Sequence, residues 1–239
     1  MRARHLAIGI ASMTLGAAPG EDVRGGGGAS SLVSRVDHLV YATPDLDRGI
    51  DEIEKLIGVR AAPGGQHPGR GTRNAVLALG PASYLEIIAP DPAQPTPASP
   101  RTFGIDSLTG SRLAAWAVTS RDVEAAASEA AREGTPLGEV KSGSRKRPDG
   151  VLLSWRFTDP QAMVAGGVVP FLIDWGASPH PASSAPKGAS LIALRAEHPA
   201  AARVQKQLRK LGLAMPVEAG PAPALIATIQ GPHGRVELR

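Results

Sequence analysis

Three segments of the sequence share one layout: a short apolar strand, a turn, and an amphipathic helix that ends near a glycine. They span residues 35–58, 112–134 and 190–212. In the first, Asp45 is placed to cap the helix, and Gly58 supplies the left-handed position that follows it. Asp122 and Gly134 take these places in the second segment. A repeat of this length predicts successive copies of one supersecondary unit.

Strand-like segments follow each repeat, and proline-rich stretches separate one repeat from the next. The predicted order is β-α-β-β-β twice, followed by a shorter β-α-β-β unit. We therefore predict an α+β fold with two modules, residues 36–91 and 112–176, and a C-terminal partial module, residues 190–239, packed on them. Residues 1–35 precede the pattern as an N-terminal extension. One module leaves a sheet face uncovered, and pairing two modules buries that face.

Composition narrows the classes of partner. The chain has no cysteine, which excludes disulfides and thiolate metal sites. Its net charge of +4 is small for 239 residues, and its basic residues form only one dense run, at 141–147, so we expect no nucleic-acid partner. We also expect no membrane partner, because no apolar run reaches the roughly 20 residues of a spanning helix. Residues 1–20 have the basic start, apolar stretch and small residues of a signal peptide. The expected location is therefore cytoplasmic, with export through this signal-like segment as the alternative.

Two ionisable side chains interrupt strands that are otherwise apolar: His38 in VDHLVY and Glu86 in SYLEII. A glycine-rich loop precedes the second strand. It carries His67, Arg70, Thr72 and Asn74. The glycines of this loop permit tight backbone turns. The loop is either a pocket wall that orients a polar substrate or a solvated surface hairpin.

Four segments in this order resemble one known superfamily. They are DHLVYATPDLD, HPGRGTRNAVLALGPASYLEII, SRKRPDGVLLSWRF and VVPFLIDWG. Together they resemble the vicinal oxygen chelate superfamily and, within it, the glyoxalase-like domain group. The resemblance covers residues 36 to 180. It implies paired βαβββ modules whose curled mixed sheets enclose a cleft, and so a glyoxalase-like domain over residues 36–176.

Metal-dependent members of this superfamily take ligands from the first and last strands of each module. The resemblance therefore implies, as one alternative, a divalent metal bound by His38 and Glu86. The second module has Ala115 at the place of His38, and alanine cannot ligate; its candidate on the last strand is Asp174. His38 and Glu86 are equally consistent with a metal-free pair that lines a ligand pocket, or with a purely structural pair.

Further candidates follow from the same resemblance. Arg145 and Arg147 lie where the family pattern carries arginine, and a guanidinium near the cleft can grip a carboxylate or a phosphate. Trp155, on the following strand, is either a core residue or a stacking platform. The predicted substrate-binding residues are His67, Arg70, Thr72, Asn74, Tyr84, Arg145, Arg147 and Trp155.

Two classes of function remain open. The first is an enzyme of lyase or isomerase type that acts on a small oxygen-rich molecule, with Glu86 as catalytic base and His38 beside it. The second is a non-catalytic protein that binds or sequesters a small molecule without metal. The four-ligand site of glyoxalase I is incomplete in this sequence. The expected partner is a small-molecule ligand, and the resemblance leaves a homodimer open.

Overall fold

The helices of both modules begin at the aspartates that the sequence singles out. A computed structural model describes residues 32–239, and the signal-like segment lies outside them. Helix α2 (Leu46–Ile57) is capped by Asp45, whose side chain accepts a hydrogen bond from the Arg48 N–H, and it ends at Gly58 with φ 86°. Helix α3 (Val123–Arg132) is capped in the same way by Asp122. A carboxylate at these positions satisfies a backbone donor that the first helical turn leaves free.

Both modules have the predicted βαβββ order. Module one contains β1 (Val36–Ala42), α2, β2 (Ala62–His67), β3 (Thr72–Gly80) and β4 (Ser83–Pro90). Module two contains β5 (Arg112–Thr119), α3, β6 (Val140–Lys146), β7 (Leu152–Thr158) and β8 (Phe171–Asp174). Short 3₁₀ helices lie in the connections: η1 (Thr102–Ser107), η2 (Pro160–Ala162), η3 (Val164–Gly167) and η4 (Pro181–Ser183). The α+β fold of paired modules is confirmed.

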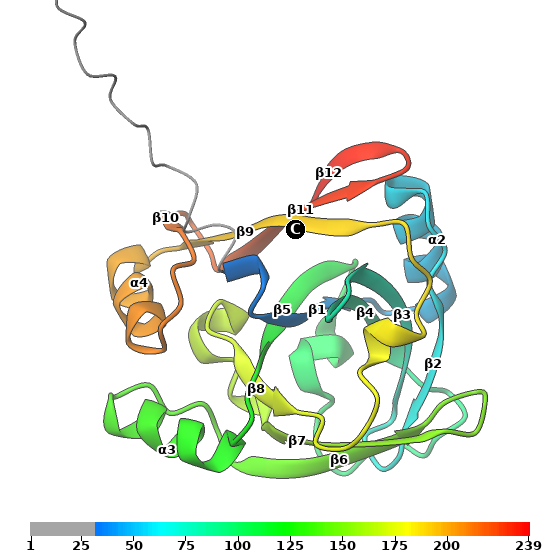
Figure 1. Cartoon of the computed structure of the whole chain (residues 1–239), viewed down its shortest axis with the longest axis horizontal. Helices are drawn as coiled ribbons and strands as arrows, with labels where there is room; N and C mark the ends of the chain where they lie inside the picture. Colours follow the sequence, from blue (N-terminus) through cyan, green and yellow to red (C-terminus); the bar gives the residue numbers. More distant parts are fainter. Residues whose placement is uncertain (1–31) are drawn as a thin grey trace, which may run out of the picture.

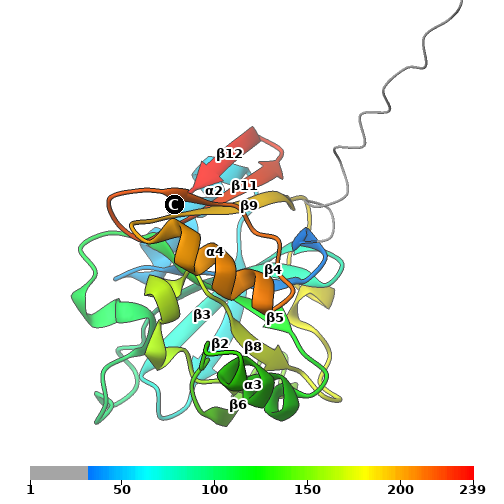
Figure 2. The same ribbon diagram turned by 90° about the vertical axis from the view of Figure 1, so that its left-hand side faces the viewer.

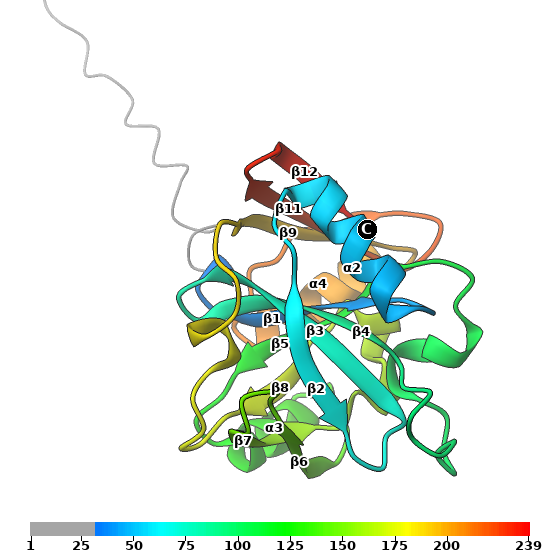
Figure 3. The same cartoon turned by 90° about the vertical axis from the view of Figure 1, so that its right-hand side faces the viewer.

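The two modules form one curled sheet with the strand order β2-β3-β4-β1-β5-β8-β7-β6. Within each module the first and last strands pair in parallel, and the modules meet where β1 and β5 pair antiparallel. The sheet curls until its two end strands approach one another, as the lower part of Figure 1 shows for β2 and β6. The guanidinium of Arg145 on β6 donates to the carbonyl of Gly64 on β2, and so joins the two ends. Figure 3 shows β2 and β3 side by side along this wall.

The third unit forms a separate sheet of its own. It contains β9 (Ser190–His198), α4 (Ala201–Lys210), β10 (Val217–Ala219), β11 (Ala224–Gly231) and β12 (Gly234–Leu238). Its strand order is β10-β9-β11-β12, so its first strand pairs with β10 and β11 and not with its last strand. Figure 2 shows α4 in front of this smaller sheet, with α3 further below. No helix among the described residues is long and apolar enough to cross a membrane.

The large sheet is apolar on both faces, but the two faces have different coverings. Its outer face packs against α2 and the third unit in one core, which includes Leu39, Ile53, Trp116, Leu194 and Leu225. Its inner face contributes a second cluster, which lies inside the curl and includes Val40, Tyr84, Ala117, Phe157 and Phe171. Strand alternation assigns successive residues to the two faces. Because helices and the second sheet cover only the outer face, the inner face is free to line a pocket.

The glycine-rich segment is not the long loop that the sequence predicts. His67 ends β2, Thr72 begins β3, and only residues 68–71 form the turn between them. Two glycines explain the composition of β2, because each lies where a side chain would collide with a neighbour. A Cβ on Gly64 would lie 2.2 Å from the side-chain oxygen of Asn74, and one on Gly65 would lie 2.4 Å from the carbonyl oxygen of Lys146. These glycines therefore let β2 approach both Asn74 and β6.

Replacing Gly64 with alanine should destabilise this wall. The added methyl group overlaps the Asn74 side chain, and overpacking of this kind costs about 1–3 kcal/mol. Gly80→Ala is the matched control, because the nearest atom to its added Cβ lies 3.9 Å away. Urea unfolding should show a lower midpoint with an unchanged slope for Gly64→Ala and a near wild-type midpoint for Gly80→Ala. Equal stability of the two variants would contradict the packing described for β2.

Candidate functional site

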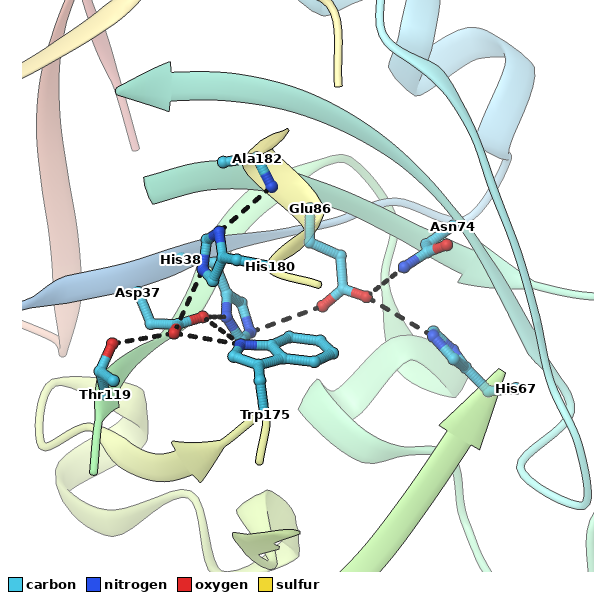
Figure 4. Close-up of polar contacts among 9 residues, drawn as sticks. All are labelled: Asp37, His38, His67, Asn74, Glu86, Thr119, Trp175, His180 and Ala182. Carbon is cyan, nitrogen blue, oxygen red and sulfur yellow. Dashed lines mark hydrogen bonds and ion pairs between the residues drawn. The ribbon is translucent and has the colours of Figure 1, made fainter. Parts of the chain in front are cut away.

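Glu86 is the carboxylate at the centre of the inner face. It lies on β4, and its residue exposure is only 8 %. Its Oε1 atom accepts a hydrogen bond of 2.6 Å from the side-chain amide of Asn74 and lies 3.7 Å from Nε2 of His67. Its Oε2 atom lies 3.9 Å from Nε2 of His38 (Figure 4). Among the described residues Oε2 accepts no hydrogen bond, so one oxygen is fixed while the other faces the histidine across a gap.

His38 is held by the residue directly before it. The pairing of β1 with β5 shifts register between Val36 and His38, so that Asp37 occupies a β-bulge. Adjacent residues of a regular strand point to opposite faces, and a bulge can re-aim one of them. The Asp37 carboxylate reaches the His38 ring, with 2.8 Å between Oδ1 and Nδ1. Nδ1 is therefore turned to Asp37 and Nε2 to Glu86.

Asp37 is the most heavily bonded polar group of the site. It is fully buried and accepts hydrogen bonds from the Thr119 hydroxyl at 2.9 Å and from the Trp175 indole N–H at 3.2 Å. Nε2 of His180 lies 3.4 Å from its other side (Figure 4). Burial alone would raise the pKa of Asp37, but hydrogen bonds and charge from His180 and His38 hold it well below its usual range. Asp37 is thus ionised, and the proton it shares with His38 resides on Nδ1.

His67 faces Glu86 from the opposite side. It ends β2, and its Nδ1 atom lies 2.9 Å from the hydroxyl oxygen of Thr72, the first residue of β3. Burial lowers the pKa of His67 to about 4, and the nearby charges of Arg145 and Arg70 lower it further, while Glu86 acts in the opposite direction. His67 is therefore neutral near pH 7.

These side chains line a small pocket inside the curled sheet. Its empty volume is about 530 Å³, with the open mouth included. The ring of Tyr84 stacks on that of His38, with 4.7 Å between centroids, and Trp155 lies edge-on to His67 at 6.3 Å. Trp175 lies beside Trp155, with 5.2 Å between their rings. The pocket thus has aromatic walls around a few convergent polar groups, which is typical of a small-molecule site.

The structure brings most of the predicted site residues together. Those that line the pocket are His38, His67, Arg70, Thr72, Tyr84, Glu86, Arg145 and Trp155. Asn74 supports Glu86 from the neighbouring strand. Arg147 lies apart from the pocket, and its guanidinium bonds the Asp149 carboxylate at 2.5 Å. The structure gives Arg147 no place at this site.

Three residues of the site are absent from the sequence prediction. Asp37 carries the same signal as Glu86, an acidic residue within an apolar strand, and that signal could have identified it. Trp175 and His180 carry no such signal, because only the fold brings them to Asp37. His180 lies just before η4, in a proline-rich connection typical of a linker, and its Nδ1 accepts a hydrogen bond of 3.2 Å from the Ala182 N–H.

The residues of module two do not complete the metal site that the superfamily resemblance implies. Glu86 pairs with Val40 across β1 and β4, and Phe171 pairs with Ala117 at the equivalent place in module two. Ala115 and Phe171 both face the inner cluster, whereas Asp174 is half-buried and accepts a hydrogen bond from the Gly176 N–H. Within residues 32–239, no three His, Asp or Glu side chains are grouped so as to hold a metal ion. The donor set therefore does not fit the four-ligand site.

Fold and site together define a vicinal oxygen chelate protein. Residues 36–212 match the glyoxalase-like domain family, and the chain belongs to that family. The sequence matches none of the curated proteins with which it was compared.

Among solved structures, a hypothetical protein from Staphylococcus aureus is 15 % identical, with a TM-score of 0.60 over 79 % of this chain and 87 % of that chain. Methylmalonyl-CoA epimerase from Mycobacterium tuberculosis is 23 % identical, with a TM-score of 0.40 over 65 % of this chain and 96 % of that chain. The first of these likenesses shows the fold alone, and the second is too distant to add to it.

The lowered pKa of His67 makes stability depend on pH. The unfolded chain binds this proton with an ordinary pKa of 6.5, and the folded chain binds it only near pH 4. The free energy of unfolding should therefore fall as pH is lowered from about 6.5 to about 4, because the unfolded state takes up the proton first. His67→Gln removes this contribution, and urea unfolding at a series of pH values should show a flatter profile over that window. A variant that keeps the wild-type slope would contradict the buried, neutral state of His67.

Proposed function

We propose that this pocket binds a small oxygen-rich molecule and moves a proton on a carbon next to a carbonyl group, with Glu86 as the base. One observation carries the proposal: Asn74 fixes one oxygen of the buried Glu86 carboxylate, while the other faces the pocket with no hydrogen-bond donor among the described residues. A positioned carboxylate in an apolar pocket is suited to proton abstraction. Fixing the first oxygen orients the second before a substrate arrives.

The proton-transfer step is balanced without any further reactant. The C–H bond of the substrate breaks, and its proton goes to Oε2 of Glu86. The bonding electron pair becomes the C=C bond of an enolate, whose negative charge rests on the former carbonyl oxygen. Return of the proton to the opposite face or to a neighbouring carbon gives an isomer. Loss of a leaving group from the adjacent carbon, with its electron pair, gives the product of a lyase.

His38 is placed to take part in the same step. Asp37 holds its Nδ1 atom, so that Nε2 is the nitrogen able to exchange a proton with a substrate oxygen. A carboxylate that fixes one nitrogen of a catalytic histidine sets both its tautomer and its orientation. Stacking on Tyr84 and the edge contact with Phe171 further restrict the ring. In this proposal Glu86 and His38 act on the substrate, and Asp37 is a positioning residue.

The second candidate function is small-molecule binding without turnover. The apolar side chains of Ala115 and Phe171, at the two module-two positions that carry metal ligands in metal-dependent superfamily members, favour it. Aromatic walls formed by Tyr84, Trp155 and Trp175 would hold a ligand without any chemistry. Binding and proton transfer make different predictions for Glu86, because a binding protein needs no acceptor for a carbon-bound proton.

Exchange of carbon-bound hydrogen with deuterium separates the two candidates. Small carbonyl compounds are incubated with the protein in D₂O, and their proton signals are followed by NMR. The wild type should accelerate exchange for at least one compound. Glu86→Gln should lower that rate by about 10²-fold or more, because general acid–base catalysis is worth about 10²–10⁴. The glutamine keeps an oxygen for Asn74, so thermal stability should change little.

Asp174→Asn is the matched control. It removes a carboxylate from the neighbouring β8 strand whose side chain bonds the Gly176 backbone and does not line the pocket. This variant should exchange at the wild-type rate. Exchange that persists in Glu86→Gln would exclude Glu86 as the base. Compounds that bind to the wild type without any accelerated exchange would favour the binding function.

A further inference from the structure

We propose that the pocket selects a small monocarboxylic acid with an apolar body, whose carboxylate is held by Arg145 and attracted by Arg70. This inference rests on the proposed function, since it names the class of molecule that the same pocket takes. It follows from two cations that line the pocket and have no acidic partner of their own among the described residues.

Arg145 is a buried cation with spare hydrogen-bond donors. It lies on β6, is only 3 % exposed and lines the pocket. One guanidinium nitrogen donates to the carbonyl of Gly64, and within residues 32–239 the side chain forms no ion pair. A guanidinium has five N–H donors, so most of them remain for a ligand. Keeping a buried charge without a counterion is costly, and an anionic ligand would remove that cost.

Arg70 supplies the second charge at the mouth of the pocket. It lies in the turn between β2 and β3 and lines both the pocket and the two surface grooves that adjoin it. Its guanidinium lies 4.8 Å from the centre of the Phe157 ring. The acid whose charge acts on Arg70 is Asp159, and that carboxylate already pairs with Lys141 at 2.5 Å. Within the described part of the chain, Arg70 has a ring contact but no ion-pair partner.

The bound anion should lie next to Glu86. Arg145 contacts Gly64, and Gly64 packs directly against Asn74, whose amide bonds the Glu86 carboxylate. A carboxylate on Arg145 therefore places the neighbouring carbon atoms close to the proposed base. Withdrawal of charge by that carboxylate–guanidinium pair also limits repulsion between the substrate and Glu86.

The charges and walls of the pocket favour a carboxylate over a phosphate. Arg70 and Arg145 contribute two positive formal charges to the lining and Glu86 one negative charge, which leaves a single charge for a monoanion to neutralise. The planar guanidinium fork matches a carboxylate in a bidentate arrangement. Phe103, Trp155 and Phe157 present apolar surface to the rest of the ligand. A phosphate dianion would add a second negative charge beside Glu86.

Three probes with the same ring and different head groups test this inference. Phenylacetate, phenylacetamide and phenyl phosphate are titrated into the protein, and binding is followed by the fluorescence of the tryptophans, two of which line the pocket. Phenylacetate should bind about tenfold more tightly than its neutral amide, or better, as expected for a charge-assisted hydrogen bond. It should also bind more tightly than phenyl phosphate.

Arginine variants locate the effect. Arg70→Gln and Arg145→Gln should each reduce the preference for phenylacetate over phenylacetamide, whereas Arg147→Gln should keep it, because Arg147 lies outside the pocket and pairs with Asp149. Arg70 lies in a turn, so its variant tests the proposal even if the buried Arg145 variant does not fold. Equal affinity for acid and amide, tightest binding of phenyl phosphate, unchanged preference in Arg70→Gln, or no binding of any probe at millimolar concentration would each overturn the proposal.

The titration measures binding and needs no turnover. A lost carboxylate preference therefore counts against the anion site alone. The base role of Glu86 is decided separately by deuterium exchange, and Glu86→Gln should still bind phenylacetate more tightly than its amide.

Discussion

A single buried carboxylate, that of Asp37, connects the parts from which the site is built. It lies at the bulge of β1 and accepts hydrogen bonds from Thr119 on β5, from Trp175 just beyond β8, and from His38. His180, before η4, closes its remaining side. Loss of such an acceptor leaves buried donors unpaired, at about 1–3 kcal/mol for each. The orientation of His38, the closure of the pocket by Trp175 and the contact between the two modules thus depend on one interaction.

The two modules have the same topology and contribute different chemistry. Module one supplies the acid–base groups, since His38, His67 and Glu86 all come from its strands. Module two supplies aromatic walls and one buried cation, through Trp155, Phe171 and Arg145. This division follows from the curl of the sheet, which faces the inner side of one module toward that of the other. The third unit covers the outer face with its own sheet and leaves the pocket side free.

The sequence predicts the fold well because repetition and helix caps are local signals. Asp45, Asp122 and Gly58 mark helix ends through interactions within a few residues, and the βαβββ order follows from them. His38 and Glu86 are also accessible from the sequence, since a charged residue in an apolar strand needs a partner. The contacts of Asp37 with Trp175 and His180 are not, because they depend on a bulge and on segments far apart in the sequence. The glycines of β2 mislead for the same reason: their neighbours, Asn74 and Lys146, come from other strands.

The protonation state of the His38 ring is the most direct test of how the site is organised. Nitrogen-15 NMR of the imidazole distinguishes a protonated from an unprotonated ring nitrogen at each position. Because Asp37 is ionised and lies 2.8 Å from Nδ1, that nitrogen should carry a proton throughout the pH range in which the protein is folded, and only Nε2, the atom facing Glu86, should titrate. A neutral His38 with its proton on Nε2 would contradict the role of Asp37 and, with it, the proposed alignment of His38 and Glu86 in the pocket.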